Sequence, residues 1–131
     1  MEVERAPDIQ MRIDEILATL SWNHVINARI ICMRSRKAQA RAYARIWSLP
    51  SIWQKALEIN PFYVIEVLTE KFDKLSYEEQ TKVLIHELMH VPKGFTGGLV
   101  PHNNRGTKID HCNVKKIYDE YKLKRKANGL E

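Results

Sequence analysis

The residues best suited to chemistry lie in the segment HELMH, where His86, Glu87 and His90 form an H-E-x-x-H motif. Side chains four residues apart on a helix are neighbours, about 5–6 Å apart at their Cβ atoms, so both imidazoles can bind one metal ion. Zinc–nitrogen bonds of about 2.0–2.1 Å suit that separation. Glu87 can act as general base on a water at the metal without occupying a coordination position. The motif therefore predicts a site for one zinc ion that hydrolyses peptide bonds.

A catalytic zinc site needs a third protein ligand and one open position. His102 follows His90 by twelve residues, after two adjacent glycines that let the chain reverse direction. His111, at the start of the last expected helix, is the second candidate, and Asp119 or Glu120 is the carboxylate alternative. We expect His102 to be the third ligand, and the other three candidates stay open.

Local signals place the motif on a helix that is followed by a long loop. Ser76 and Glu79 form the capping box S-x-x-E at the head of YEEQTKVLIHELMHV, and Pro92 ends the helical pattern. Residues 92–109 contain four of the five glycines and two of the prolines, so we expect an irregular loop there. Loops of this length in small domains are usually functional. A last helix is expected from about Asp110 to Lys124.

The upstream part of the chain predicts a mixture of helices and strands. Hydrophobic spacing and turn residues indicate a helix over 7–20, a strand over 24–33, a helix over 37–47, a short helical piece from Ser51 and a strand over 62–68. Together with the two later helices, these elements predict an α+β fold with a small mixed sheet. We expect one domain over residues 1–131.

Composition favours a globular intracellular protein. The chain has 131 residues, of which 44% are hydrophobic and 28% charged, which excludes disordered and fibrous classes. No apolar run approaches the roughly 18 residues of a membrane helix, and Glu2, Glu4 and Asp8 stand where a secretory signal carries basic and apolar residues. Two cysteines are too few for a disulfide framework. We expect a cytoplasmic chain with no membrane partner and with Cys32 and Cys112 as free thiols.

The formal net charge of +5 is unevenly distributed. No acidic residue occurs between Glu15 and Glu58, whereas six basic residues fall between Arg29 and Arg45. Such a basic cluster can be a footprint for nucleic acid, or simply a solvated surface. The alternative function is therefore a zinc-stabilised nucleic-acid- or protein-binding module that uses the basic 29–45 cluster. Weak nonspecific binding to polyanions is expected in either case, and association into a homodimer stays open.

Several segments together resemble the minigluzincins, small soluble zinc metallopeptidases of the abylysin and jannalysin type. The resemblance is carried by ARAYARIW (Ala40–Trp47), YVIEVL (Tyr63–Leu68), HELMHVP (His86–Pro92), FTGGLVPH (Phe95–His102) and IDHCNVKKIYDEY (Ile109–Tyr121). It implies a zincin-like metallopeptidase core, a peptide or protein substrate and a histidine as third ligand. It also implies a zymogen in which the C-terminal segment, about 111–131, keeps the enzyme latent.

The resemblance also implies where the substrate lies. In a zincin the strand above the metal pairs with the extended substrate backbone. We expect residues 63–68 to be that edge strand, with Tyr63, Val64 and Ile65 as substrate-binding residues. His111 or Tyr118 is the expected hydrogen-bond donor to the tetrahedral intermediate.

Overall fold

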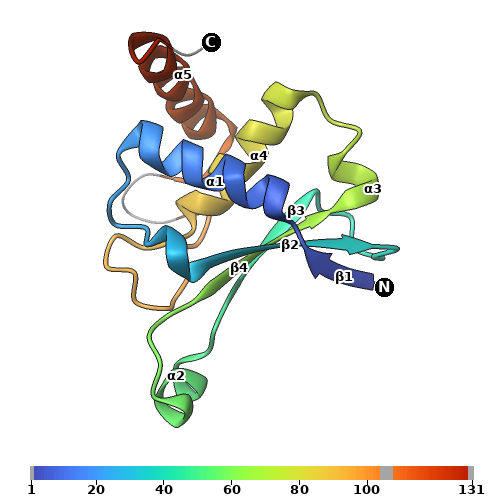
Figure 1. The fold of residues 1–131 in the computed structure, drawn as a ribbon, viewed down its shortest axis with the longest axis vertical. Helices are drawn as coiled ribbons and strands as arrows, with labels where there is room; N and C mark the ends of the chain where they lie inside the picture. The colour runs from blue at the N-terminus through green and yellow to red at the C-terminus, as the bar shows by residue number, and fades with distance from the viewer. Residues whose placement is uncertain (1, 104–107, 130–131) are drawn as a thin grey trace.

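Strands and helices are mixed along the first half of the chain, and the elements after β4 are all helices (Figure 1). In the computed structural model, which describes residues 2–103 and 108–129, the elements are β1 (Glu2–Arg5), α1 (Pro7–Leu20), the 3-10 turn η1 (Asn27–Arg29), β2 (Ile30–Arg36), β3 (Ala44–Ser48), α2 (Ser51–Leu57), β4 (Tyr63–Leu68), α3 (Thr69–Phe72), α4 (Tyr77–Met89) and α5 (His111–Ala127). The α+β composition expected from the sequence is confirmed. No helix in the described part of the chain is long and apolar enough to cross a membrane.

The four strands form one mixed sheet in the order β1-β2-β4-β3. β2 runs parallel to β4, while β1 and β3 pair antiparallel at the two outer positions. The expectation that residues 63–68 form an edge strand is therefore wrong, because β4 is paired on both sides. The outer strand beside β4 is β3, most of which lies within residues 37–47, where the sequence predicts a helix.

Helices cover one face of the sheet and form the hydrophobic core with it. In Figure 1, α1 and α4 lie along the same side of the sheet, and α5 packs against both of them. The helix predicted over 7–20 is confirmed, and the apolar residues that recur along it at helical spacing are buried on one face. The core joins Ile9, Ile13, Ile16, Leu17 and Leu20 of α1 to Ile30, Cys32, Ile65 and Val67 of the sheet and to Leu84, Ile85 and Leu88 of α4.

Two of the expected elements differ from the structure. Residues 37–47 are not a helix, because residues 44–48 form β3 and pair with β4 along their whole length. The carboxylate of Glu66 in β4 accepts hydrogen bonds from Arg45 at 3.0 Å and from the Trp47 indole at 2.8 Å. This tertiary pairing outweighs the helix propensity of the alanines and arginines. The strand expected over 24–33 begins only at Ile30 and continues to Arg36, after η1.

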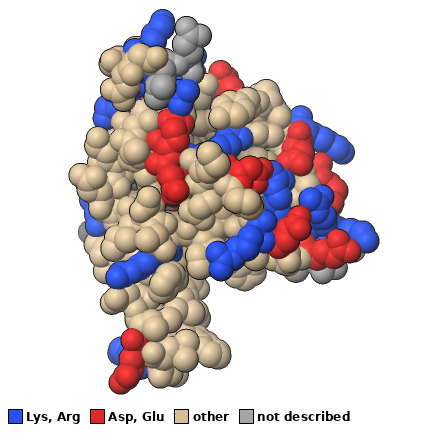
Figure 2. All heavy atoms as spheres, in the orientation of Figure 1, with Lys and Arg blue, Asp and Glu red and all other residues tan. Residues whose placement is uncertain are grey.

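The basic 29–45 cluster is largely matched by acidic side chains. Arg34 pairs with Asp8 at 2.6 Å and with Asp73 at 3.1 Å. Arg36 pairs with Glu4 of β1 at 3.1 Å. Lys37 pairs with Glu2, and Arg45 pairs with Glu66. Figure 2 shows the two signs of charge intermixed at the end of the molecule that carries β1, rather than a separate positive surface.

α5 is anchored to the helical layer by hydrogen bonds as well as by packing. The Tyr121 hydroxyl donates to Glu15 of α1, and Arg125 forms an ion pair with the same carboxylate at 2.8 Å. The Tyr118 hydroxyl donates to Glu78 at 3.3 Å. Burial disfavours ionisation of Glu15, but the hydrogen bonds from Thr19, Tyr121 and Arg125 outweigh burial and hold its pKa below the usual range.

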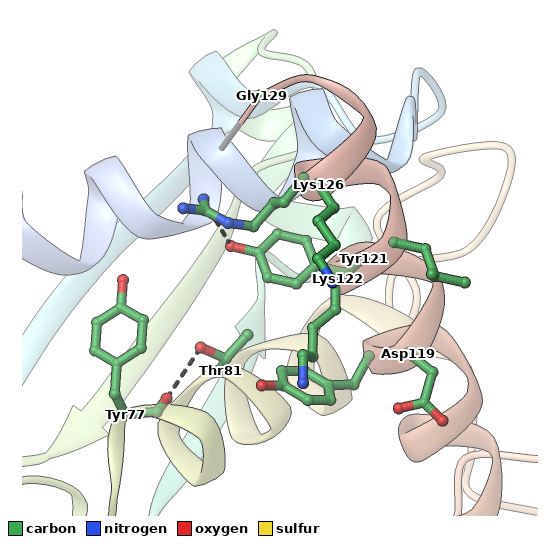
Figure 3. Close-up of a pocket in the computed structure, with 10 residues that line it drawn as sticks. Tyr77, Thr81, Asp119, Tyr121, Lys122, Lys126 and Gly129 are labelled. Carbon is green, nitrogen blue, oxygen red and sulfur yellow. Dashed lines mark hydrogen bonds between the residues drawn. The ribbon is translucent and has the colours of Figure 1, made fainter. Parts of the chain in front are cut away.

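A hollow of about 940 Å³ lies between the N-terminal half of α4 and the C-terminal half of α5. Figure 3 shows Tyr77 and Thr81 entering it from α4, with Asp119, Tyr121, Lys122 and Lys126 entering from α5. None of the five histidines of the sequence lines it. This hollow is therefore separate from the histidine site described next.

Candidate metal centre

α4 presents its histidines at its C-terminal end, and its N-terminal end is fixed by the predicted capping box. The Ser76 hydroxyl accepts from the Glu79 N–H at 3.1 Å, and the Glu79 carboxylate accepts from the Ser76 N–H at 3.2 Å. The helix ends at Met89, and His90 is its C-cap with right-handed helical angles of φ −74° and ψ −15°. The four-residue helical spacing from His86 to His90 is therefore kept, and their ring centroids lie 5.3 Å apart.

The loop after α4 brings a third histidine to this pair. The ring centroid of His102 lies 5.2 Å from that of His86 and 4.6 Å from that of His90. One ligand nitrogen from each of the three rings lies within 4.8 Å of the others. The remaining candidates from the sequence lie outside this group. His111 is exposed at the first residue of α5, and the exposed Asp119 and Glu120 form ion pairs with lysines of α5.

The donor set suits a divalent transition metal. Two nitrogens bound tetrahedrally to one zinc ion at about 2.0–2.1 Å are about 3.3 Å apart. The Nε2 atoms of His86 and His102 are 3.1 Å apart, which is close to that value. Burial, together with the neighbouring His90 and His102, lowers the pKa of His86 to about 4. Its imidazole is therefore neutral at pH 7 and has a lone pair for a metal.

His90 is oriented by the loop itself. Its Nδ1 lies 2.5 Å from the Val100 carbonyl oxygen, and the Val100 N–H donates back to the His90 carbonyl at 2.7 Å. A carbonyl only accepts, so Nδ1 carries the proton and Nε2 keeps its lone pair. Burial lowers the pKa of His90, whereas the bond to Val100 raises it. Ligand histidines in metal sites typically have such a partner on the second ring nitrogen.

Glu87 lies next to the first histidine in an apolar environment. The residue is 6% exposed, and its Oε2 is 3.8 Å from His86 Nδ1. Burial raises the pKa of Glu87 to about 8. A buried carboxyl group with a pKa near neutrality beside a cluster of metal-binding side chains is suited to proton transfer.

The structure places the expected substrate-binding residues elsewhere. Tyr63 and Ile65 are fully buried in the core, and the register pairs residues 63–65 with β2 on one side and β3 on the other. The main-chain groups of Tyr63, Val64 and Ile65 are therefore not available to a substrate, which corrects that expectation. Of the two strands with an outer edge, β1 and β3, it is β3 that neighbours β4, and it packs against α4.

Neither expected donor to the tetrahedral intermediate lies in the histidine group. The Tyr118 hydroxyl donates to Glu78 in the first turn of α4. Eight residues of helix at 1.5 Å per residue separate Glu78 from His86, which is about 12 Å along the axis. His111 is exposed on α5. Tyr63, expected from the sequence to bind substrate, instead donates a hydrogen bond to the loop that carries His102. A buried tyrosine in a strand has no sequence signal that would indicate this contact.

Comparison with known families gives a match over most of the chain. The family model described as "Putative phage metallopeptidase" matches residues 1–122, which is most of the chain and includes all three clustered histidines and Glu87. No curated protein and no solved structure matches the chain.

Proposed function

The chain belongs to the phage metallopeptidase family, and from that premise we propose that it is a zinc-dependent endopeptidase of the H-E-x-x-H type. The observation that carries the proposal is the convergence of His86, His90 and His102 beside the buried Glu87. A group of three histidines, to which the described residues add no fourth cysteine, histidine or carboxylate, is typical of a catalytic zinc site rather than a structural one.

The metal and the chain have separate tasks in the proposed reaction. A zinc ion, when bound, polarises the scissile carbonyl and makes the attacking water more acidic. His86, His90 and His102 would hold the ion. Glu87 accepts the proton of the attacking water on its carboxylate and then donates that proton to the amine nitrogen of the leaving group. Its carboxylate lies beside the histidine cluster, 3.8 Å from His86 Nδ1, where it can carry out both transfers.

The edge of β3 is the proposed binding strand for the substrate. Its outer side is unpaired in the described sheet, so its N–H and C=O groups can pair with an extended peptide. β3 also packs against α4, the helix that carries Glu87. The substrate class is therefore an extended segment of a peptide or protein, recognised mainly through its backbone.

Two further ideas from the sequence do not enter the proposed function. α5 packs against α1 and α4, and its tyrosines bond to Glu15 of α1 and to Glu78 of α4. These contacts give the helix a role in the core, and latency through residues 111–131 stays a prediction from the resemblance. The nucleic-acid-binding alternative loses its main support, because four of the six basic residues in the 29–45 cluster form ion pairs with acidic side chains.

The proposed function is tested by separating metal binding from hydrolysis. Glu87→Gln should retain zinc, measured by elemental analysis, and should lose hydrolysis of a casein or quenched-fluorophore peptide substrate. Glu78→Gln, an exposed glutamate on the same helix, is the matched control and should keep wild-type activity. Hydrolysis by Glu87→Gln at the wild-type rate would contradict the proposed mechanism.

A further inference from the structure

The segment that delivers His102 contains neither helix nor strand. Residues 92–102 leave the end of α4 and return to it, and no ladder of main-chain hydrogen bonds fixes their path. Individual contacts must therefore hold the third histidine within reach of the other two. The described residues of this segment contact both the sheet and the end of α4.

A single tyrosine hydroxyl from the sheet makes two of these contacts. Tyr63 Oη donates to the Gly98 carbonyl at 2.9 Å and accepts from the Gly97 N–H at 2.9 Å. The Tyr63 side chain is fully buried, and its ring meets that of Phe95 edge to face with centroids 5.1 Å apart. Both hydrogen-bonding roles of the hydroxyl are thus used by the loop.

A second anchor lies directly after the first. Val100 is bonded twice to His90, so only Leu99 separates the anchored Gly98 from the anchored Val100. His102 follows two residues later, a span of at most about 7 Å. The sheet, through Tyr63, and the active-site helix, through His90, therefore hold the loop just before its ligand.

We propose that Tyr63 is a positioning residue for the third metal ligand: its hydroxyl fixes residues 97–98 and thereby holds His102 against His86 and His90. This inference rests on the proposed function only in taking these histidines as metal ligands. Without the hydroxyl, the buried Gly97 N–H loses its partner and the loop samples other paths. The metal must then order the loop as it binds, which reduces the apparent affinity by the fraction of time that the site is assembled.

The direct test is Tyr63→Phe, which removes the hydroxyl and retains the ring that packs on Phe95. Cobalt(II) affinity, measured by competition with a chromophoric chelator, should fall about 10- to 100-fold, the usual effect of losing a residue that orients a ligand. The visible absorption of the cobalt form reports the coordination geometry and should change in the same variant. Tyr121→Phe is the matched control, because its buried hydroxyl bonds to Glu15 on α1. It should keep wild-type affinity and spectrum.

A double-mutant comparison separates positioning from general destabilisation. If Tyr63 acts through His102, then Tyr63→Phe should change cobalt affinity less than about threefold in a His102→Ala background. An equal loss in both backgrounds would overturn the inference, and so would wild-type affinity and spectrum in Tyr63→Phe itself.

A second pair of variants covers the case in which Tyr63→Phe does not fold. Gly97 has a φ of +97°, a backbone conformation that residues with a Cβ rarely adopt, so Gly97→Ala strains the anchored segment with the hydroxyl in place. It should weaken cobalt binding with the same dependence on His102. Gly129→Ala is its control, because Gly129 has a φ of +78° with open space around it, at the end of α5. Wild-type cobalt binding by a folded Gly97→Ala variant would overturn the inference.

The outcomes also separate this inference from the proposed function. If His86→Ala binds cobalt as wild type does, the proposed function fails. If His86→Ala loses cobalt while Tyr63→Phe binds it normally, only the role of Tyr63 fails.

Discussion

Val100 and His90 are joined by two hydrogen bonds, one from the ring Nδ1 to the Val100 carbonyl at 2.5 Å and one from the Val100 N–H to the His90 carbonyl at 2.7 Å. One of the clustered histidines and the segment that supplies another are thereby fixed to each other. These two bonds tie the loop to the end of α4, so the three imidazoles can come together although residues 92–102 form neither helix nor strand. The side chain of His90 is also oriented by the same contact.

The first prediction separates the two histidines that the sequence left open. His102→Ala should reduce bound zinc well below one ion per chain after dialysis, because it removes one of three clustered imidazoles. His111→Ala should keep about the wild-type content, since His111 is exposed on α5 outside the cluster. Elemental analysis by mass spectrometry gives both values. Loss of zinc in His111→Ala with retention in His102→Ala would reverse the assignment.

The second prediction concerns the effect of metal on stability. A ligand that binds only the folded state, at 100 times its Kd, adds about 2.7 kcal/mol to the free energy of unfolding. Zinc at that level should therefore raise the melting temperature of the wild-type protein, and a chelator should reverse the change. His24→Ala should show the same shift, because His24 packs near Trp22 and not in the cluster.

His86→Ala should lose most of that shift, which circular dichroism or differential scanning fluorimetry can measure. An unchanged shift in His86→Ala would mean that zinc stabilises the protein at some other place.

The third prediction concerns the C-terminal helix and the idea of latency. Val114, Tyr118 and Tyr121 of α5 are buried in the core. Burying a large apolar side chain contributes about 1.5–3 kcal/mol, so the three together are comparable to the 5–15 kcal/mol that stabilises a typical domain. Deleting residues 111–131 should therefore abolish cooperative unfolding rather than release activity.

The control for this deletion is Leu123→Ala, because Leu123 is on the same helix and is 70% exposed. This variant should change the free energy of unfolding by less than about 0.5 kcal/mol. A truncated chain that unfolds cooperatively and cuts casein faster than the full chain would contradict the prediction. It would indicate that the C-terminal segment keeps the enzyme latent.

Elements with strong local signals could be predicted from the sequence. The capping box and the helical spacing identified α4 and its histidines, and the apolar repeat identified α1. Two glycines were enough to predict that the loop returns His102 to the helix. In these cases the information lies within a few residues of the feature that it specifies.

Features that depend on distant pairing could not be predicted in the same way. β1 is a wholly exposed strand in which three of the four residues are charged, and its partners Arg36 and Lys37 lie more than thirty residues away. β3 follows an Ala- and Arg-rich segment that favours a helix, and its pairing with β4 is what makes it a strand. Without β3, the sequence alone predicts β4 as the edge strand and Tyr63 as a substrate-binding residue, and the pairing of β3 with β4 corrects both.

The last prediction concerns Glu66, the buried carboxylate that joins β4 to β3. It is 5% exposed, and it accepts two hydrogen bonds from Arg45, at 3.0 and 3.1 Å, besides that from Trp47. Burial raises the pKa of Glu66, but the hydrogen bonds, with that of Arg45 the largest, outweigh burial and hold it below the usual 4.5. Since its pKa is lower in the folded state than in the unfolded state, Glu66 stabilises the fold above about pH 4.5, and this contribution is lost as the pH falls through the folded-state value.

Glu66→Gln should therefore lower the free energy of unfolding at pH 7 by about 1–3 kcal/mol, because the buried carboxylate loses its charge-assisted bonds to the partly exposed Arg45 guanidinium. The variant should also lose less stability than the wild-type protein between pH 5 and pH 3, roughly the range in which a depressed carboxylate pKa acts. Urea denaturation at several pH values measures both effects. Glu120→Gln, at an exposed i,i+4 pair with Lys124, is the control and should match wild type at every pH. If Glu66→Gln and wild type lose stability in parallel on acidification, the pairing of β3 with β4 does not depend on this charge.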